Sequence, residues 1–131
     1  MDYGVINETD GNAPQTERIV VGSTTRDLTT ATSTQAIAGL GFKPSYVQLF
    51  GTIDGAEAGG WGVSDGTNEK TFGQAVASSF ANSSGALYAI VDGSNLQTAK
   101  VQSFDVSGFT LSWVKSGTPT GTMQVYYTAF K

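Results

Sequence analysis

A turn followed by a strand is encoded by Gly41-Phe42-Lys43-Pro44-Ser45-Tyr46-Val47-Gln48-Leu49-Phe50-Gly51-Thr52. Gly41 permits backbone angles that are closed to other residues, and Pro44 fixes φ and removes a hydrogen-bond donor. From Ser45 onward, alternate residues form two faces, one with Tyr46, Gln48 and Phe50 and one with Val47, Leu49 and Gly51. Because both faces carry large apolar residues, we expect this strand in the middle of a sheet or under a subunit contact.

Short strands separated by turn residues are expected along the rest of the chain. Working outward, the pattern predicts strands at residues 18–22, 26–32, 33–39, 61–64, 69–74, 76–81, 87–91, 98–105, 109–114 and 122–130. Residues 54–60 are rich in glycine and are interpreted as a flexible loop, and helical periodicity is weak and confined to 74–81. A spacing of roughly 8–12 residues between turns is typical of an all-β, antiparallel β-sandwich, jelly-roll-like in kind.

The first sixteen residues differ from the rest, so we divide the chain into an N-terminal arm, 1–16, and a β-sandwich domain, 17–131. The arm is polar apart from an apolar island at Tyr3, Val5 and Ile6, and it contains turn signals at Asp10-Gly11 and Pro14. We expect the arm to be extended and its apolar island to contact the surface of another subunit or protein. Pairing of the arm within its own domain is the alternative.

Composition narrows the classes of partner. The chain has 131 residues, a net charge of −4 and only 14% charged residues, and its Lys and Arg residues are scattered. Binding to nucleic acid phosphates needs clustered basic residues, so no nucleic-acid partner is expected. No apolar run approaches the roughly 20 residues of a membrane span, and the N-terminus lacks the pattern of a signal peptide. We therefore expect a protein that is made in a cytoplasm, stays soluble and has no membrane partner.

Catalytic and metal-binding residues are scarce. The absence of His and Cys removes the commonest general base, the thiol nucleophile and most zinc sites. Asp54, Asp65 and Asp92 each precede Gly, where Asp is explained by turn geometry. A Ca²⁺ site that combines Glu57 or Glu69 with Asp54 or Asp65 is a less favoured alternative, because Asp-x-Asp-x-Asp spacing is missing. We expect no enzyme activity, no cofactor and no resident metal.

Aromatic residues support two interpretations. A sugar-binding platform could be formed by Trp61, Trp113, Tyr88, Tyr126 and Tyr127, because aromatic rings offer flat apolar faces. Packing in the core or between subunits is the favoured alternative, since Trp113 and Tyr127 alternate with polar residues in strands. Trp61 follows the glycine-rich residues 58–60, so we expect an exposed contact at Trp61.

Four short motifs lie within residues 17–131, namely Gly41-Phe42-Lys43-Pro44-Ser45-Tyr46-Val47, Asp65-Gly66-Thr67, Phe104-Asp105 with Gly108-Phe109-Thr110-Leu111, and Tyr127-Thr128-Ala129-Phe130. With these motifs the chain resembles small virion proteins of tailed phages, in which a Gly-Phe-x-Pro turn, a Gly-Phe-Thr-Leu strand and a closing Tyr-x-Ala-Phe strand recur. The resemblance implies a head decoration (cement) protein or a domain of a tail fibre, and it supplies no catalytic residues.

The sequence therefore favours a structural virion protein that decorates and stabilises a bacteriophage capsid. Its expected place is the capsid surface of the virion, with the major capsid protein and further copies of itself, as a homotrimer, as partners. Oligomerisation is expected because one small sandwich has a single interior, whereas strands 45–52 and 122–130 are apolar on both faces. The alternative is a receptor- or carbohydrate-binding module of a phage tail fibre, and an enzyme ranks last.

Overall fold

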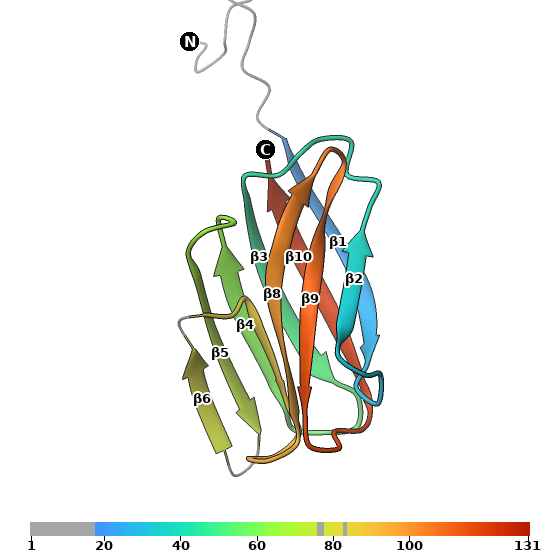
Figure 1. Cartoon of the computed structure of the whole chain (residues 1–131), viewed down its shortest axis with the longest axis vertical. Coiled ribbons are helices and arrows are strands. Elements are labelled where there is room, and N and C mark those ends of the chain that lie inside the picture. The colour runs from blue at the N-terminus through green and yellow to red at the C-terminus, as the bar shows by residue number, and fades with distance from the viewer. Residues whose placement is uncertain (1–17, 76–77, 83) are drawn as a thin grey trace, which may run out of the picture.

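Two antiparallel sheets face each other in the computed structural model, which describes residues 18–75, 78–82 and 84–131 (Figure 1). The six-stranded sheet has the order β1 (Ile19–Asp27), β10 (Thr122–Phe130), β3 (Tyr46–Ile53), β4 (Gly59–Ser64), β5 (Glu69–Ala75) and β6 (Ser78–Asn82). The four-stranded sheet has the order β2 (Ser33–Ile37), β9 (Gly108–Ser116), β8 (Leu96–Asp105) and β7 (Leu87–Ile90). The predicted all-β antiparallel sandwich is confirmed.

The strand that organises the sequence lies inside the larger sheet. β3 pairs with β10 on one side and with β4 on the other, so its predicted place in the middle of a sheet is confirmed. Val47 and Leu49 face the sandwich interior and are buried, whereas Gln48 and Phe50 face outward and are exposed. The strand begins at the turn that Pro44 sets, where the Ser45 amide donates to the Phe130 carbonyl oxygen at 2.8 Å.

The core fills the space between the two sheets. It is built mainly from alternate residues of the strands, with Leu28 added from the turn after β1. Its largest fully buried members are Trp113, Phe109, Leu28, Leu87, Ile90, Leu111 and Met123. Tyr127 packs against this core, and its ring meets that of Phe109 edge-on with centroids 5.4 Å apart. The expectation that Trp113 and Tyr127 belong to the core is therefore confirmed.

Two local expectations are wrong. A separate strand at residues 26–32 does not form, because β1 continues through Asp27 and residues 28–32 then turn towards β2. Asp27 stabilises that turn by accepting hydrogen bonds from the amide and the hydroxyl of Thr29. The glycine-rich loop ends earlier than expected, because Gly59 already belongs to β4.

Glycines in β4 and β5 allow β7 to approach closely. Gly60 and Gly62 face the interior, and a Cβ atom at Gly62 would collide with the carbonyl oxygen of Ala86, directly before β7. Gly73 in β5 likewise faces Tyr88 and Ile90 of β7. The inner surface of β4 is therefore bare backbone at Gly60 and Gly62, and alternation places Trp61, between them, on the outer face.

The expected arm, with Tyr3, Val5 and Ile6, lies outside the described residues. Within the part of the chain that the structure describes, no helix has the length and hydropathy needed to cross a membrane.

Candidate functional site

Four aromatic residues form a row across the outer face of the six-stranded sheet. The strand register pairs Tyr126 of β10 with Phe50 of β3, Phe50 with Trp61 of β4, and Trp61 with Phe72 of β5. Tyr126, Phe50 and Trp61 are 50%, 51% and 55% exposed, and Phe72 is half-buried. We call these four residues the aromatic row. Contiguous apolar patches on a protein surface are a feature of interaction sites, so the aromatic row is a candidate binding surface.

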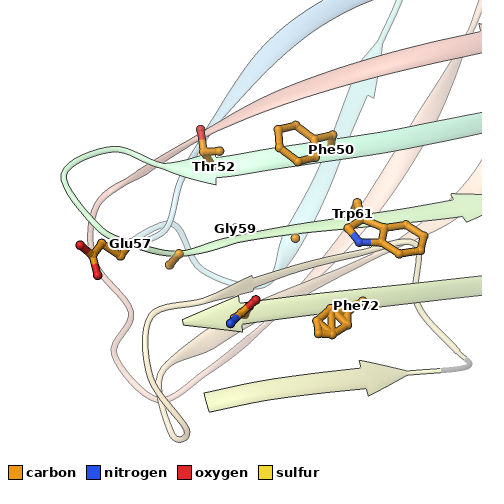
Figure 2. A pocket seen from close by; sticks show the side chains of 9 residues that line it. Phe50, Thr52, Glu57, Gly59, Trp61 and Phe72 are labelled. Atoms are coloured by element: carbon orange, nitrogen blue, oxygen red, sulfur yellow. The ribbon is translucent and has the colours of Figure 1, made fainter. Parts of the chain in front are cut away.

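A hollow lies beside this row, and we call it the Trp61 pocket. Gly59 faces outward between Thr52 of β3 and Gln74 of β5, and because it has no side chain the sheet is open at this point. The pocket has a volume of about 310 Å³ and is lined by Phe50, Thr52, Glu57, Gly59, Trp61, Phe72 and Gln74, with Ala58 and Gly60. Figure 2 shows the rings of Phe50, Trp61 and Phe72 on neighbouring strands, with Thr52 and Glu57 nearer the strand ends.

The polar side chains around the pocket are available for a ligand. The Thr52 hydroxyl, the Glu57 carboxylate and the Gln74 amide have no hydrogen-bond partner among the residues that the structure describes. Together they offer acceptors and donors next to apolar ring faces. The pocket therefore combines hydrogen-bonding side chains with apolar aromatic faces within one small area.

A second groove lies on the other side of the Phe50 and Trp61 rings. It has a volume of about 330 Å³ and its outward-facing lining is Val21, Gln48, Phe50, Trp61, Val63, Tyr126 and Thr128. Val21 is 72% exposed, and Ile19, two residues earlier on the same strand face, is 59% exposed. We call the surface formed by Ile19, Val21 and Tyr126 the β1 surface.

The outer edge of β1 carries unpaired backbone groups. Hydrogen bonds from Lys131 to Arg18 and from Leu28 to Gly121 close the two ends of the pairing between β1 and β10. Because bonded positions alternate in an antiparallel pair, the N–H and C=O groups of Ile19, Val21 and Ser23 point away from β10. They have no partner within residues 18–75, 78–82 and 84–131. We call these three positions the β1 edge.

The C-terminal part of the same edge is covered. Thr25 also points its carbonyl oxygen outward, and this oxygen accepts a hydrogen bond from Gln35 Nε2 at 2.9 Å. The Gln35 side chain comes from β2, so the two sheets are linked along this part of their edges. Of the outer edge of β1, the N-terminal half alone is left uncovered by the residues that the structure describes, so this half can pair with another strand.

The outer face of the four-stranded sheet has a different character. Its outward-facing positions on β2, β9 and β8 include Thr34, Ala36, Thr110, Ser112, Val114, Thr98 and Lys100. Val114 is the single large apolar residue in that set, at 55% exposed. Five of the seven large hydrophobic residues that are exposed in the described chain lie instead on the six-stranded sheet, and these are Ile19, Val21, Phe50, Trp61 and Tyr126.

The carboxylates are engaged in local structure. Asp65 accepts hydrogen bonds from the backbone and side chain of Asn68 and from the Thr67 amide, and these bonds hold its pKa below the ordinary value. Asp92 likewise accepts hydrogen bonds from the Asn95 side chain and from the backbone amides of Ser94 and Asn95. These bonds also lower the pKa of Asp92. Both residues were expected to serve turns, and they do.

The proposed Ca²⁺ ligands do not converge. Glu69 Oε2 accepts a hydrogen bond from the Val101 amide at 2.7 Å, next to a bulge in β8, and Asp54 Oδ2 accepts one from Gln124 Nε2 at 2.8 Å. No group of three or more acidic side chains that could hold a metal ion occurs in the described part of the chain.

The expected sugar platform is only partly assembled. Trp113 is fully buried and Tyr127 packs against the core, whereas Trp61 and Tyr126 lie on the outer face. Phe50 and Phe72 complete the row, and sequence reasoning did not select them. Alternation in the sequence does place Phe50 on the same strand face as Tyr46 and Gln48. It does not show which residues of the adjacent strands lie beside Phe50, because that depends on strand register. The expected contact at Trp61 stays a prediction.

Comparison of the chain with protein-family models, with curated proteins and with solved structures finds no match.

Proposed function

We propose that this chain is a non-catalytic structural protein of a virion, which decorates a bacteriophage capsid and assembles through the β1 surface and the β1 edge. The observation that carries the proposal is the coincidence of exposed Ile19, Val21 and Tyr126 with an open strand edge. The resemblance of residues 17–131 to small virion proteins of tailed phages supplies the setting. The partners in this proposal are the major capsid protein and further copies of the chain, as a homotrimer.

The chemistry of the β1 edge supports pairing with a strand of another protein. Ile19, Val21 and Ser23 each present one donor and one acceptor, and an extended segment can bond to such a row by strand addition. The side chains of Ile19 and Val21 would then lose their exposure. Main-chain bonds supply affinity in such contacts, and apolar side chains next to them supply additional burial.

The contrast between the two sheets also supports assembly through the larger one. A sheet face that stays in water is usually polar, as the Thr- and Ser-rich face of the four-stranded sheet is. The β1 surface bears no charged side chain, and interface centres are depleted in charge and enriched in aromatic residues. The hydrogen-bonded state of Asp65, Asp92 and Glu69 is consistent with a structural role for the carboxylates.

The test compares matched exposed residues on the two sheets. Particles that lack the protein are incubated with the purified chain or with variants, and bound protein is counted per particle by quantitative mass spectrometry after sedimentation. The Ile19→Ser/Val21→Ser double variant is expected to lose most binding, while Val114→Ser on the other sheet binds as the unmodified chain does. A copy number of only a few per particle, or full binding of the double variant, would refute the proposal.

A further inference from the structure

We propose that the Trp61 pocket binds a neutral oligosaccharide, with one sugar ring against Trp61 and its hydroxyl groups at Thr52, Glu57 and Gln74. This goes beyond the assembly role, because the pocket lies over β3, β4 and β5, whereas the β1 surface lies over β1 and β10. Either proposal can therefore hold without the other.

The aromatic part of the pocket suits the apolar face of a sugar. Pyranose rings present a flat set of C–H groups, which pack on aromatic ring faces and lose water there. Trp61 is 55% exposed although its backbone is held between β3 and β5. Because pairing with β3 and β5 fixes the backbone of Trp61 before any ligand arrives, only its side-chain torsions remain to be ordered on binding.

The polar part of the pocket suits the hydroxyl groups of the same sugar. A hydroxyl group both donates and accepts, and the pocket offers the Thr52 hydroxyl, the acceptor oxygens of Glu57 and the Gln74 amide. A purely apolar ligand would remove these three groups from water without replacing their hydrogen bonds, which is unfavourable. The aromatic contact and the hydrogen bonds together therefore favour a ligand with a flat apolar face and polar groups around its edge.

Charge and ring arrangement exclude other ligand classes. Among the described residues of the lining, Glu57 is the only charged one, so a phosphate, a nucleotide or an acidic sugar would meet repulsion with no basic partner there. The three rings lie side by side on one sheet face, as the register and Figure 2 show. They do not surround a central point, which is the arrangement that binds a quaternary ammonium group.

The size and openness of the site indicate a chain of sugars. About 310 Å³ is at the lower end of small-molecule pockets and holds only part of an oligosaccharide. The aromatic row continues through Phe50 to Tyr126, and the site lies on an open sheet face. Neighbouring sugar units can therefore extend over the row, outside the pocket itself.

The two tryptophans of the chain provide an internal control for a binding experiment. Trp113 is fully buried and its Nε1 donates to Gln35 Oε1 at 2.9 Å, so its indole resonance reports the fold. Trp61 is in the pocket, so its indole resonance reports ligand. We would titrate the isolated full chain with neutral hexaoses of glucose, mannose, galactose and N-acetylglucosamine, and separately with hexagalacturonic acid, and record proton–nitrogen correlation spectra.

We expect at least one neutral hexaose to shift the Trp61 indole resonance to saturation while the Trp113 resonance stays in place. Trp61→Ala, followed through backbone amides of β4 and β5, should weaken binding about tenfold or more, and Gln74→Ala about fivefold. Val114→Ala, on the other sheet and equally exposed, should bind unchanged. The proposal is wrong if no neutral hexaose moves Trp61, if both pocket variants bind normally, or if hexagalacturonic acid binds as tightly. None of these outcomes depends on assembly through β1.

Discussion

Arg26 and Gln97 are joined inside the sandwich by a 3.0 Å hydrogen bond from Arg26 Nε to Gln97 Oε1. Arg26 is 5% exposed and Gln97 is fully buried. The other acceptors of the guanidinium group are also neutral, Ser33 Oγ and the Ala31 carbonyl oxygen, and the group lies over the Trp113 ring. Burial lowers the pKa of Arg26, but an arginine keeps its proton in proteins. A buried cation thus donates its hydrogen bonds to neutral groups and lies over an aromatic ring, while the charge of Asp27 opposes the lowering of its pKa.

The first prediction concerns this pair. Arg26→Met leaves the buried Gln97 oxygen without a donor, and Gln97→Leu leaves the carbonyl oxygens of Leu28 and Thr30 without one. Each change should lower the free energy of unfolding by about 3 kcal/mol, because buried polar groups lose their partners. In urea unfolding, the double variant should be less destabilised than the sum of the two by about 1 kcal/mol or more. Additive losses would show that the two residues act independently.

A second prediction tests the close approach of β7 to β4. Gly62→Ala puts a methyl group against the carbonyl oxygen of Ala86, and backbone must move to make room. We expect a loss of about 3 kcal/mol in the free energy of unfolding, the upper range for an overpacked core. The control is Val63→Ala, the next residue in β4, which faces outward and should cost about 1 kcal/mol or less. Equal losses for the two variants would contradict the packing described for β7.

The third prediction is a dependence of stability on pH. Hydrogen bonds from Asn68 lower the pKa of Asp65, and those from Asn95 lower the pKa of Asp92. A carboxylate whose pKa is lower in the folded state binds protons more readily when unfolded. Its contribution is therefore complete above the unfolded pKa of about 3.9 and is lost as pH falls through the folded pKa. Urea midpoints should be flat near neutral pH and fall below about pH 4.

The matched variant for this effect is Asp65→Asn/Asp92→Asn, which keeps one side-chain oxygen at each site to accept from the backbone amides, gives up the bond from the Asn68 or Asn95 side chain to the other oxygen, and removes both titrations. Its urea midpoint should change less than that of the unmodified chain between neutral and acid pH. An acid transition of unchanged size in the variant would assign the effect to other groups, such as Asp105, whose pKa is lowered by the hydroxyls of Ser103 and Thr110.

The fourth prediction separates the β1 edge from the β1 surface. Ser23→Pro removes an N–H that points outward, so the fold should survive while strand addition is blocked. Thr24→Pro removes an N–H that faces β10, and it should lower the free energy of unfolding by about 3 kcal/mol. Thermal melts check the fold and sedimentation with particles checks assembly. Assembly of Ser23→Pro at full strength would mean that the edge is not used.

The fifth prediction concerns the arm. Because β1 begins at Ile19, deletion of residues 1–16 should leave the circular dichroism spectrum and melting temperature of the sandwich nearly unchanged. Attachment to particles should weaken strongly, and replacement of Tyr3, Val5 and Ile6 by Ser should have much of the same effect, since their burial is worth roughly 1.5–3 kcal/mol each. If the truncated chain sediments with particles as well as the full one does, the arm has no part in attachment.

The sequence alone determined the class of fold and much of the core. Turn residues at short intervals and two-residue alternation are local signals, so they identified the sandwich, the central position of β3 and the burial of Trp113. Local signals did not predict the start of β4, because its first two residues are glycines. Gly59 and Gly60 have the composition of a loop, and only the approach of β7 to β4 and β5 explains why glycines occupy a strand.

Tertiary structure decided the candidate site. Tyr126, Phe50, Trp61 and Phe72 come from four strands, and their alignment in one row depends on three registers between strands. Register is fixed by which faces are buried across the whole sheet, and no single strand contains that information. The Trp61 pocket depends in the same way on Gly59 facing outward between Thr52 and Gln74. The sequence supplied the side chains. Pairing of consecutive strands aligned Phe50, Trp61 and Phe72, and the long-range pairing of β10 with β3 added Tyr126.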